Sequence, residues 1–230
     1  MLRLKFENIR LNSACELLCA DCPCWPAAEP RPAAEIQSQS RLVNLTGGNP
    51  LNHPELGRIL ARLKQNKHLV ALTTGGYRLE NLEAKFLRFI DFIFLYVPAS
   101  TSEKSTLRCG LNAWKQQLNA IEYLQEIRQK FAVLHPVDRD TLEDLPDLHH
   151  KLNRQNSYLL ILRNKKTGNA VSRREKAHLY YYGRKPNALV YEYRQNGAEH
   201  CLDFGAQLER PSLYNYWTIA KMFYKFSFLG

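Results

Sequence analysis

The sequence predicts an α/β protein built on a parallel sheet: a partial (β/α)6 TIM-like barrel, followed by a small antiparallel hairpin and a C-terminal cap. Two observations lead to this prediction. Short apolar, β-branched or aromatic runs recur through the first two thirds of the chain, and segments with helical periodicity lie between them. Strands that alternate with helices form parallel sheets with right-handed crossovers. About six such units fit before residue 165, too few for a closed eight-stranded barrel.

The expected strands are, in chain order, "LRLKF" near 2–6, "RLVNLT" at 41–46, "HLVALTT" at 68–74, "FIFLYVPA" at 92–99, "FAVLHPV" at 131–137 and "YLLILR" at 158–163. Between them, "PELGRILARLKQN" and "LEDLPDLHHKLN" repeat aliphatic residues every three or four positions, and Pro54 suits a helix start. We interpret these stripes as core packing. The longest stripe comprises Leu111, Trp114, Leu118, Ile121 and Leu124.

The pattern changes after residue 163. The stretch "ALVYEYRQNGAEHCLDF" reads as a hairpin, in which Asn196-Gly197 supplies the positive φ angles of a tight turn. We therefore expect a core at residues 1–163 and a basic, aromatic extension at residues 164–230 within the same domain. The aromatic end, "YNYWTIAKMFYKFSFLG", is expected to cap the barrel, with an oligomer contact or a membrane surface as alternatives.

The chain has no apolar leader after Met1, and its most apolar run, "FLRFIDFIFLYVPA", is interrupted by Arg88 and Asp91. We expect a cytoplasmic protein without a transmembrane segment. Thiols stay reduced in that compartment, so clustered cysteines there usually bind metal or do redox chemistry.

The net charge of +10 is concentrated in one block. Residues 151–196 hold 11 basic and 2 acidic side chains, whereas residues 1–150 hold 18 and 17. A cationic surface with interleaved tyrosines suits an anionic small molecule, an acidic peptide or RNA. The structural alternative is a solvated basic face of a sheet.

Four of the six cysteines are crowded into ten positions: Cys15, Cys19, Cys22 and Cys24. Disulfides between such close pairs are geometrically awkward. Structural zinc usually takes two separated ligand pairs, and no second pair is present, because Cys109 and Cys201 stand alone. A compact C-x3-C-x2-C loop instead suits an iron–sulfur cube whose corners one loop can reach. The loop follows the first expected strand, at the edge where parallel α/β proteins build their active sites.

The sequence "CELLCADC" (15–22) resembles the cysteine loop of the radical S-adenosylmethionine (radical SAM) enzymes. Three further elements follow in the order of that family. "LTGGNP" (45–50) stands where the family usually has Gly-Gly-Glu-Pro, "TTGG" (73–76) ends the third strand, and "STLRCG" (105–110) opens the next helix. The resemblance covers about residues 1–163.

The resemblance implies a 4Fe-4S cluster on Cys15, Cys19 and Cys22, with S-adenosyl-L-methionine on the open iron and a reductant such as flavodoxin or ferredoxin. It implies hydrogen abstraction from a substrate that the sequence does not name. The cofactor-binding residues that it suggests are Gly47, Gly48, Asn49, Pro50, Thr74, Ser100 and His135. For His135 a structural role is the alternative.

The sequence departs from the family pattern at two positions. Asn49 replaces the usual Glu, so a charge opposite the methionyl ammonium is lost, although the amide oxygen still accepts hydrogen bonds. Asp21 replaces an aromatic residue that packs near the adenine, for which Trp25 is a substitute. A degenerate member, or an RNA-binding protein that carries a cluster or zinc, is therefore the alternative function.

Two more cysteines stay open. Cys24 is a fourth ligand, a thiol facing the substrate, or a buried small hydrophobic residue. Cys109 is expected at a helix start, where the helix dipole favours a reactive thiolate.

Overall fold

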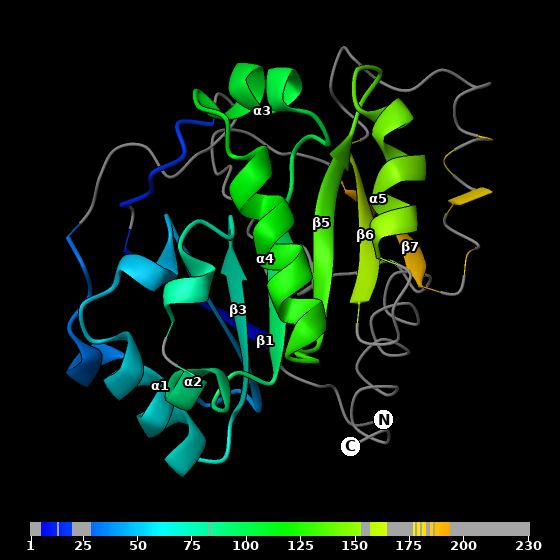
Figure 1. The fold of residues 1–230 in the computed structure, drawn as a ribbon. Coiled ribbons are helices and arrows are strands. Elements are labelled where there is room, and N and C mark those ends of the chain that lie inside the picture. Colours follow the sequence, from blue (N-terminus) through cyan, green and yellow to red (C-terminus); the bar gives the residue numbers. More distant parts are fainter. Residues whose placement is uncertain are drawn as a thin grey trace.

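The computed structural model describes residues 6–12, 14–19, 29–82, 84–152 and 157–164, and then residues 177, 179, 181, 182, 185 and 187–193. These residues form one sheet of seven strands in the order of the chain, each parallel to the next (Figure 1). The strands are β1 (Phe6–Asn12), β2 (Leu42–Gly47), β3 (Leu69–Thr74), β4 (Phe92–Tyr96), β5 (Phe131–Val137), β6 (Ser157–Asn164) and β7 (Ala188–Tyr193). The sheet does not close within the described residues, which confirms the predicted partial barrel.

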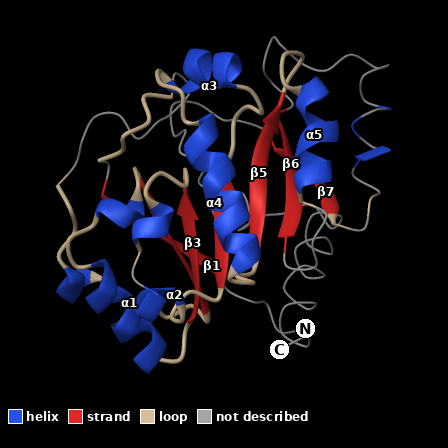
Figure 2. Cartoon of the chain, viewed as in Figure 1, coloured by secondary structure: helices blue, strands red, loops and turns tan. Residues whose placement is uncertain are grey.

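Helices connect the strands and cover one face of the sheet (Figure 2). They are α1 (Leu56–Gln65), α2 (Ala84–Leu87), α3 (Ser102–Cys109), α4 (Trp114–Glu126) and α5 (Leu145–Lys151). Single 3-10 turns precede or follow them: η1 (Ala33–Glu35), η2 (Pro50–Asn52), η3 (Leu79–Asn81) and η4 (Leu142–Asp144). Helix α3 differs from the others, because it lies beyond the carboxyl ends of the strands (Figure 1).

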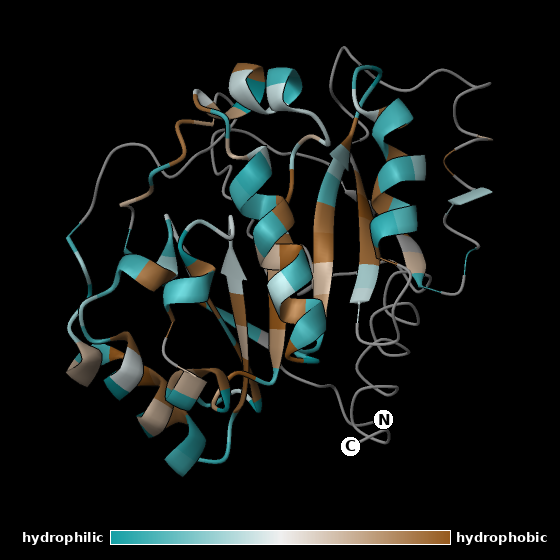
Figure 3. Cartoon of the chain, in the orientation of Figure 1, coloured by the Kyte–Doolittle hydropathy of each residue, from teal (hydrophilic) through white to brown (hydrophobic). Residues whose placement is uncertain are grey.

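The core lies between the sheet and these helices, and hydrophobic residues concentrate along the strands (Figure 3). The aliphatic stripe of α1 is buried there as expected, with Leu56, Ile59, Leu60 and Leu63 all in the core. The expected stripe of α4 is partly wrong. Leu118 is only half-buried, and the buried turn is instead occupied by Gln117, whose Nε2 donates to the carbonyl of Tyr96 at 3.1 Å.

The opposite face of the sheet carries a polar ladder at its amino-terminal strands. Asn44 Nδ2 donates to Asn8 Oδ1 at 2.8 Å, and Thr73 Oγ1 donates to Asn44 Oδ1 at 3.0 Å. Side chains alternate between the two faces of a strand. Val43 and Leu45 thus join the helix-covered core, while Asn44 between them points the other way. The sheet is therefore apolar toward the helices and partly polar toward its other side.

Two elements extend beyond what the sequence predicts. The first strand, expected near 2–6, is described from Phe6 to Asn12, where Ile9 and Leu11 are buried, and residues 2–5 lie outside the described residues. The first arm of the expected hairpin, β7, pairs in parallel with β6 and so extends the main sheet. The turn at Asn196-Gly197, the second arm and the aromatic end lie outside the described residues, so the proposed extension at 164–230 stays a prediction. Within the described part of the chain, no helix has both the length and the apolar character that a membrane span requires.

Candidate functional site

The carboxyl ends of β1, β2 and β3 bring two sequence motifs together. One is the cysteine loop, residues 14–24, of which the structure describes 14–19; the other is the GGNP turn, residues 47–50. The backbone N–H of Gly48 donates to the carbonyl of Asn12 at 3.0 Å, and that of Asn49 donates to the carbonyl of Ala14 at 2.7 Å. Segments more than thirty residues apart are therefore joined through their backbones at the edge of the sheet where the active site was expected.

Gly47 makes this close approach possible. Its φ angle is +135°, and a Cβ atom there would lie 2.2 Å from the carbonyl oxygen of Asn12. L-residues with a side chain rarely adopt such a φ angle, and the carbonyl oxygen leaves no space for one. Pro50 follows as a buried residue in the first turn of η2, where its missing N–H costs nothing.

Asn49 lies at the centre of the site and is only 1% exposed. Its Nδ2 donates to Glu16 Oε2 at 3.0 Å and to the carbonyl of Tyr77 at 3.2 Å. Its Oδ1 accepts from the N–H of Leu51 at 3.3 Å and from Thr74 Oγ1 at 3.0 Å. The side chain therefore ties the cysteine loop, the GGNP turn and the end of β3 to one another.

Thr74 is also buried and hydrogen-bonded within the protein. Its hydroxyl donates to Asn49 and accepts from the N–H of Gly76 at 3.1 Å, and the residue is 2% exposed. It holds the turn after β3 against the GGNP turn. Contact of Gly47, Gly48, Asn49, Pro50 or Thr74 with a cofactor stays a prediction.

The cysteine loop is held on its other side by the connection between α3 and α4. The N–H of Leu18 donates to the carbonyl of Cys109 at 2.8 Å. Gly110, with a φ angle of +69°, ends α3 and lets Leu18 approach so closely that a Cβ there would lie 2.8 Å from the Cβ of Leu18. Leu17 is buried against Cys109 and Ala113 in a small cluster that Cys15 and Cys19 border.

This arrangement corrects the expectation for Cys109. The residue ends helix α3 instead of starting it, so the helix dipole there does not favour a thiolate. Cys109 is fully buried and packs against Leu17. Its role is to support the cysteine loop.

Cys109→Ala is therefore expected to leave iron incorporation intact and to lower the free energy of unfolding by about 1 kcal/mol, the usual scale for a small buried truncation. Iron analysis after anaerobic reconstitution, together with urea unfolding, measures both quantities. Loss of iron with unchanged stability would contradict the supporting role.

The described part of the cysteine loop contains two of the expected metal ligands. Cys15 and Cys19 are thiols, half-buried and on the same short loop. Cys22 and Cys24 lie outside the described residues, and so do Asp21 and Trp25. No three His, Cys, Asp or Glu side chains among the described residues are grouped closely enough to hold a metal ion. Assignment of the three-cysteine set stays a prediction, and two neighbouring thiols at the sheet edge fit the soft-ligand chemistry of an iron–sulfur cluster.

Ser100 and His135 lie farther along the same edge. The N–H of Ser100 donates to Asp144 Oδ2 at 3.0 Å. His135 is fully buried, with Nδ1 2.8 Å from the carbonyl oxygen of Val97 and Nε2 3.2 Å from that of Thr141. Burial lowers the pKa of His135 below its ordinary value, although both contacts oppose the shift. A neutral ring donates through one nitrogen, and we assign the hydrogen to Nδ1, which has the shorter contact. Both ring nitrogens thus lie against backbone carbonyls, which fits the structural alternative, and contact of Ser100 or His135 with a cofactor stays a prediction.

Ion pairs fasten α3 to the loop after β5. Lys104 Nζ lies 2.9 Å from Asp144 Oδ1 and 2.6 Å from Glu143 Oε1. Arg108 pairs with Asp138. Burial opposes ionisation of Asp138, but hydrogen bonding and charge from Arg108 outweigh it and lower the pKa of that carboxyl. The helix that supports the cysteine loop is thus itself anchored at two points.

Two residues of the site were not singled out from the sequence. Glu16, between two expected ligands, is bonded to Asn49, and Asn12, the last residue of β1, donates through Nδ2 to the carbonyl of Asn49 at 3.3 Å. Asn12 Oδ1 is buried and has no donor among the described residues. The sequence did contain a signal for Glu16. The cysteine loop carries this glutamate, while the GGNP turn has Asn49 where the family usually has glutamate.

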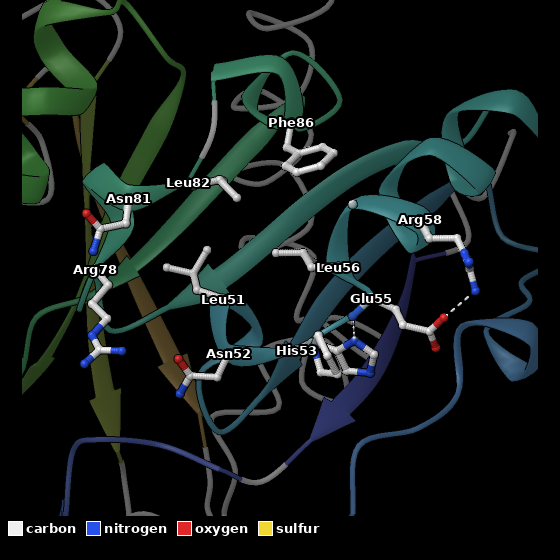
Figure 4. Close-up of a pocket in the computed structure, with 12 residues that line it drawn as sticks. Leu51, Asn52, His53, Glu55, Leu56, Arg58, Arg78, Asn81, Leu82 and Phe86 are labelled. Carbon is white, nitrogen blue, oxygen red and sulfur yellow. Dashed lines mark hydrogen bonds and ion pairs between the residues drawn. The ribbon is translucent and has the colours of Figure 1, made fainter.

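A pocket of about 750 Å³ is lined by residues of η2, the start of α1, the η3 turn and α2 (Figure 4). Leu51, Leu56, Leu82 and Phe86 form its apolar wall, while the ion pair of Arg58 with Glu55, 2.6 Å long, lies to one side. None of the expected site residues lines this pocket. We therefore place the candidate site at the cysteine loop and the GGNP turn.

The cysteine loop is fastened to the carboxyl ends of parallel strands, the edge where α/β enzymes build their active sites, and its thiols suit an iron–sulfur cluster. The model of the radical SAM superfamily matches residues 27–152, more than half of the chain. The chain belongs to the radical SAM superfamily. The matched residues begin just after the cysteine loop. No curated protein matches the chain.

Solved structures share the fold at low sequence identity. Streptococcus suis SuiB bound to S-adenosylmethionine has a TM-score of 0.66 and 15% identity, covering 82% of this chain and 50% of SuiB. A radical SAM methyltransferase from Sphaerobacter thermophilus has a TM-score of 0.61 and 12% identity, covering 84% of this chain and 67% of that one. The structure of anSMEcpe with bound AdoMet and Cp18Cys peptide has a TM-score of 0.57 and 14% identity, covering 77% of this chain and 59% of that one. The chain thus spans about half the length of SuiB.

Proposed function

We propose that the protein is a radical SAM enzyme that holds a 4Fe-4S cluster on Cys15, Cys19 and Cys22 and binds S-adenosyl-L-methionine at the GGNP turn. The observation that carries the proposal is the hydrogen bond from the N–H of Asn49 to the carbonyl of Ala14. It fastens the turn expected to bind the amino-acid end of the cofactor directly before the first cysteine. Membership of the superfamily supports the same assignment.

The chain's own residues supply position and shielding. Leu17, buried with Cys109 and Ala113, gives the cysteine loop an apolar support that excludes water from one side. Gly47 brings the GGNP turn against β1, and Thr74 fixes the third strand end to it. A 4Fe-4S cluster held by Cys15, Cys19 and Cys22 would supply the electron for reductive cleavage of S-adenosylmethionine, the chemistry that would allow hydrogen abstraction from a substrate. A flavodoxin or ferredoxin is the reductant that we propose.

For the substrate we propose an anionic molecule or a peptide. SuiB, which shares the fold, has also been solved bound to the precursor peptide SuiA. The basic block at residues 151–196 would attract an acidic partner. RNA is the alternative partner, and strongly salt-dependent binding of RNA without cofactor cleavage would favour it.

Anaerobic reconstitution tests the enzymatic proposal. We expect about four irons per chain, and formation of 5′-deoxyadenosine when dithionite and S-adenosylmethionine are added. Reaction mixtures without reductant are the control. Zinc without iron, or a cluster whose spectrum ignores the added cofactor, would overturn the proposal.

A further inference from the structure

Asn49 has no hydrogen-bonding capacity left for a ligand. A carboxamide offers two N–H donors and two acceptor lone pairs. Both hydrogens of Nδ2 are directed to acceptors, Glu16 Oε2 and the carbonyl of Tyr77. Both lone pairs of Oδ1 are met by donors, the N–H of Leu51 and the hydroxyl of Thr74. The residue that occupies the position of the family's glutamate is therefore saturated within the protein, and it is also buried.

The negative charge that position 49 lacks is present on Glu16. Its Oε2 accepts the hydrogen bond from Asn49 at 3.0 Å, so the carboxylate lies against the same turn. Glu16 is half-exposed, unlike Asn49, and no other hydrogen bond or ion pair of its carboxylate is found within the described residues. Oε1 and the remaining lone pair of Oε2 are thus available to a cation. Glu16 also directly follows the first expected cluster ligand, Cys15.

We propose that Glu16 binds the methionyl ammonium group of S-adenosylmethionine, as the carboxylate that replaces the glutamate missing at position 49. This inference rests on the proposed function. Asn49 then orients Glu16 through Nδ2 and is itself held in place by Thr74, Leu51 and Tyr77. In this chain the carboxylate would thus be carried by the cysteine loop instead of the GGNP turn, and the hydrogen bond between the two side chains holds it against that turn.

The two positions should exclude each other as carboxylates. A glutamate at 49 would place a second negative charge beside Glu16, where the amide hydrogen now donates. Two like charges at such a distance, in a partly buried site, repel each other. We therefore expect the site to accept a carboxylate at position 16 or at position 49, but not at both. Substitutions at the two positions can test this expectation.

The test uses the full-length, reconstituted protein with its cluster oxidised, so that S-adenosylmethionine binds without being cleaved. The affinity is measured by equilibrium dialysis, and iron is counted in each sample. We expect Glu16→Gln to weaken binding about ten-fold or more, since a hydrogen bond to a charged group is worth that much. Iron content should be unchanged. Glu126→Gln, at the far end of α4 and with the same change of charge, is the matched control and should bind like the parent.

Asn49→Glu supplies the second arm of the test. Alone it should weaken binding, because two carboxylates then meet. Combined with Glu16→Gln, which leaves one carboxylate, it should restore the affinity to within about three-fold of the parent. Equal binding by Glu16→Gln and the parent would overturn the inference, and so would loss of iron in Glu16→Gln or failure of the double variant to recover. A parent that incorporates iron but binds no S-adenosylmethionine would instead overturn the proposed function itself.

Discussion

Single replacement by alanine of any of three cysteines should abolish a stable 4Fe-4S cluster: Cys15, Cys19 and Cys22. In the proposed site each thiolate would hold one iron, and two protein ligands would not retain a cluster that normally has three or four. Iron and sulfide analysis after anaerobic reconstitution, with the absorption and paramagnetic resonance spectra, measures the loss. We expect the iron content to fall from about four per chain to near zero.

Cys24→Ala is the matched control, because it removes a thiol from the same loop. It should keep the cluster and its response to S-adenosylmethionine. A residue before proline favours an extended conformation, so the sequence predicts that Cys24 could approach the same side of the chain as Cys22. Cys24→Ala therefore tests the three-ligand assignment directly. A Cys24→Ala variant that loses the cluster, or that gains cofactor cleavage absent from the parent, would show that the fourth iron is closed and that the enzymatic proposal is wrong.

Gly47→Ala should be the most damaging single change outside the cysteines. The new Cβ would lie 2.2 Å from the carbonyl oxygen of Asn12, and the φ angle of +135° is strained for alanine. Because the obstacle is backbone, β1 and the GGNP turn must separate. We expect a loss of about 3 kcal/mol or more in the free energy of unfolding, measured by urea unfolding of the protein without iron.

Gly75→Ala provides the comparison. There the added Cβ would meet the end of the Leu17 side chain, Cδ1, at 2.6 Å, and a side chain can turn away. The expected cost is about 1 kcal/mol. If Gly47→Ala were no more destabilising than Gly75→Ala, the contact between the GGNP turn and β1 would not be as rigid as the structure indicates.

The sheet could be predicted from the sequence because buried parallel strands and amphipathic helices have distinct periodicities. The same reasoning missed details that depend on partners far along the chain. The first strand was expected near residues 2–6, whereas the described strand continues to Asn12, because pairing with β2 carries it through Glu7 and Asn8, where the alternation is broken. Strand β7 was expected only as one arm of a hairpin, and its parallel pairing with β6 was not predicted, because that pairing leaves no local signal in the sequence.

In the candidate site, too, local features could be predicted from the sequence, whereas contacts between distant residues could not. The spacing of the cysteines and the glycines of the GGNP turn are local features, and the family resemblance that they carry is confirmed. The placement of Cys109 was wrong because the end of α3 is set by Gly110, whose left-handed conformation lets Leu18 pack close. The role of Asn49 depends on Glu16 and Thr74, which lie more than twenty residues away from it, and only the fold brings them together.

The two backbone contacts of the cysteine loop have a thermodynamic consequence. Ala14 is held by Asn49, and Leu18 is held by Cys109, in both cases through backbone hydrogen bonds that involve no thiolate. Ordering a flexible backbone costs about 1–2 kcal/mol per residue, and here folding has already met that entropy cost for this part of the loop. The free energy of iron–thiolate bonding would then contribute to the affinity for the cluster and would not be needed to order this part of the loop. A protein that has lost its iron should therefore keep this part of the loop preorganised and be refilled without refolding.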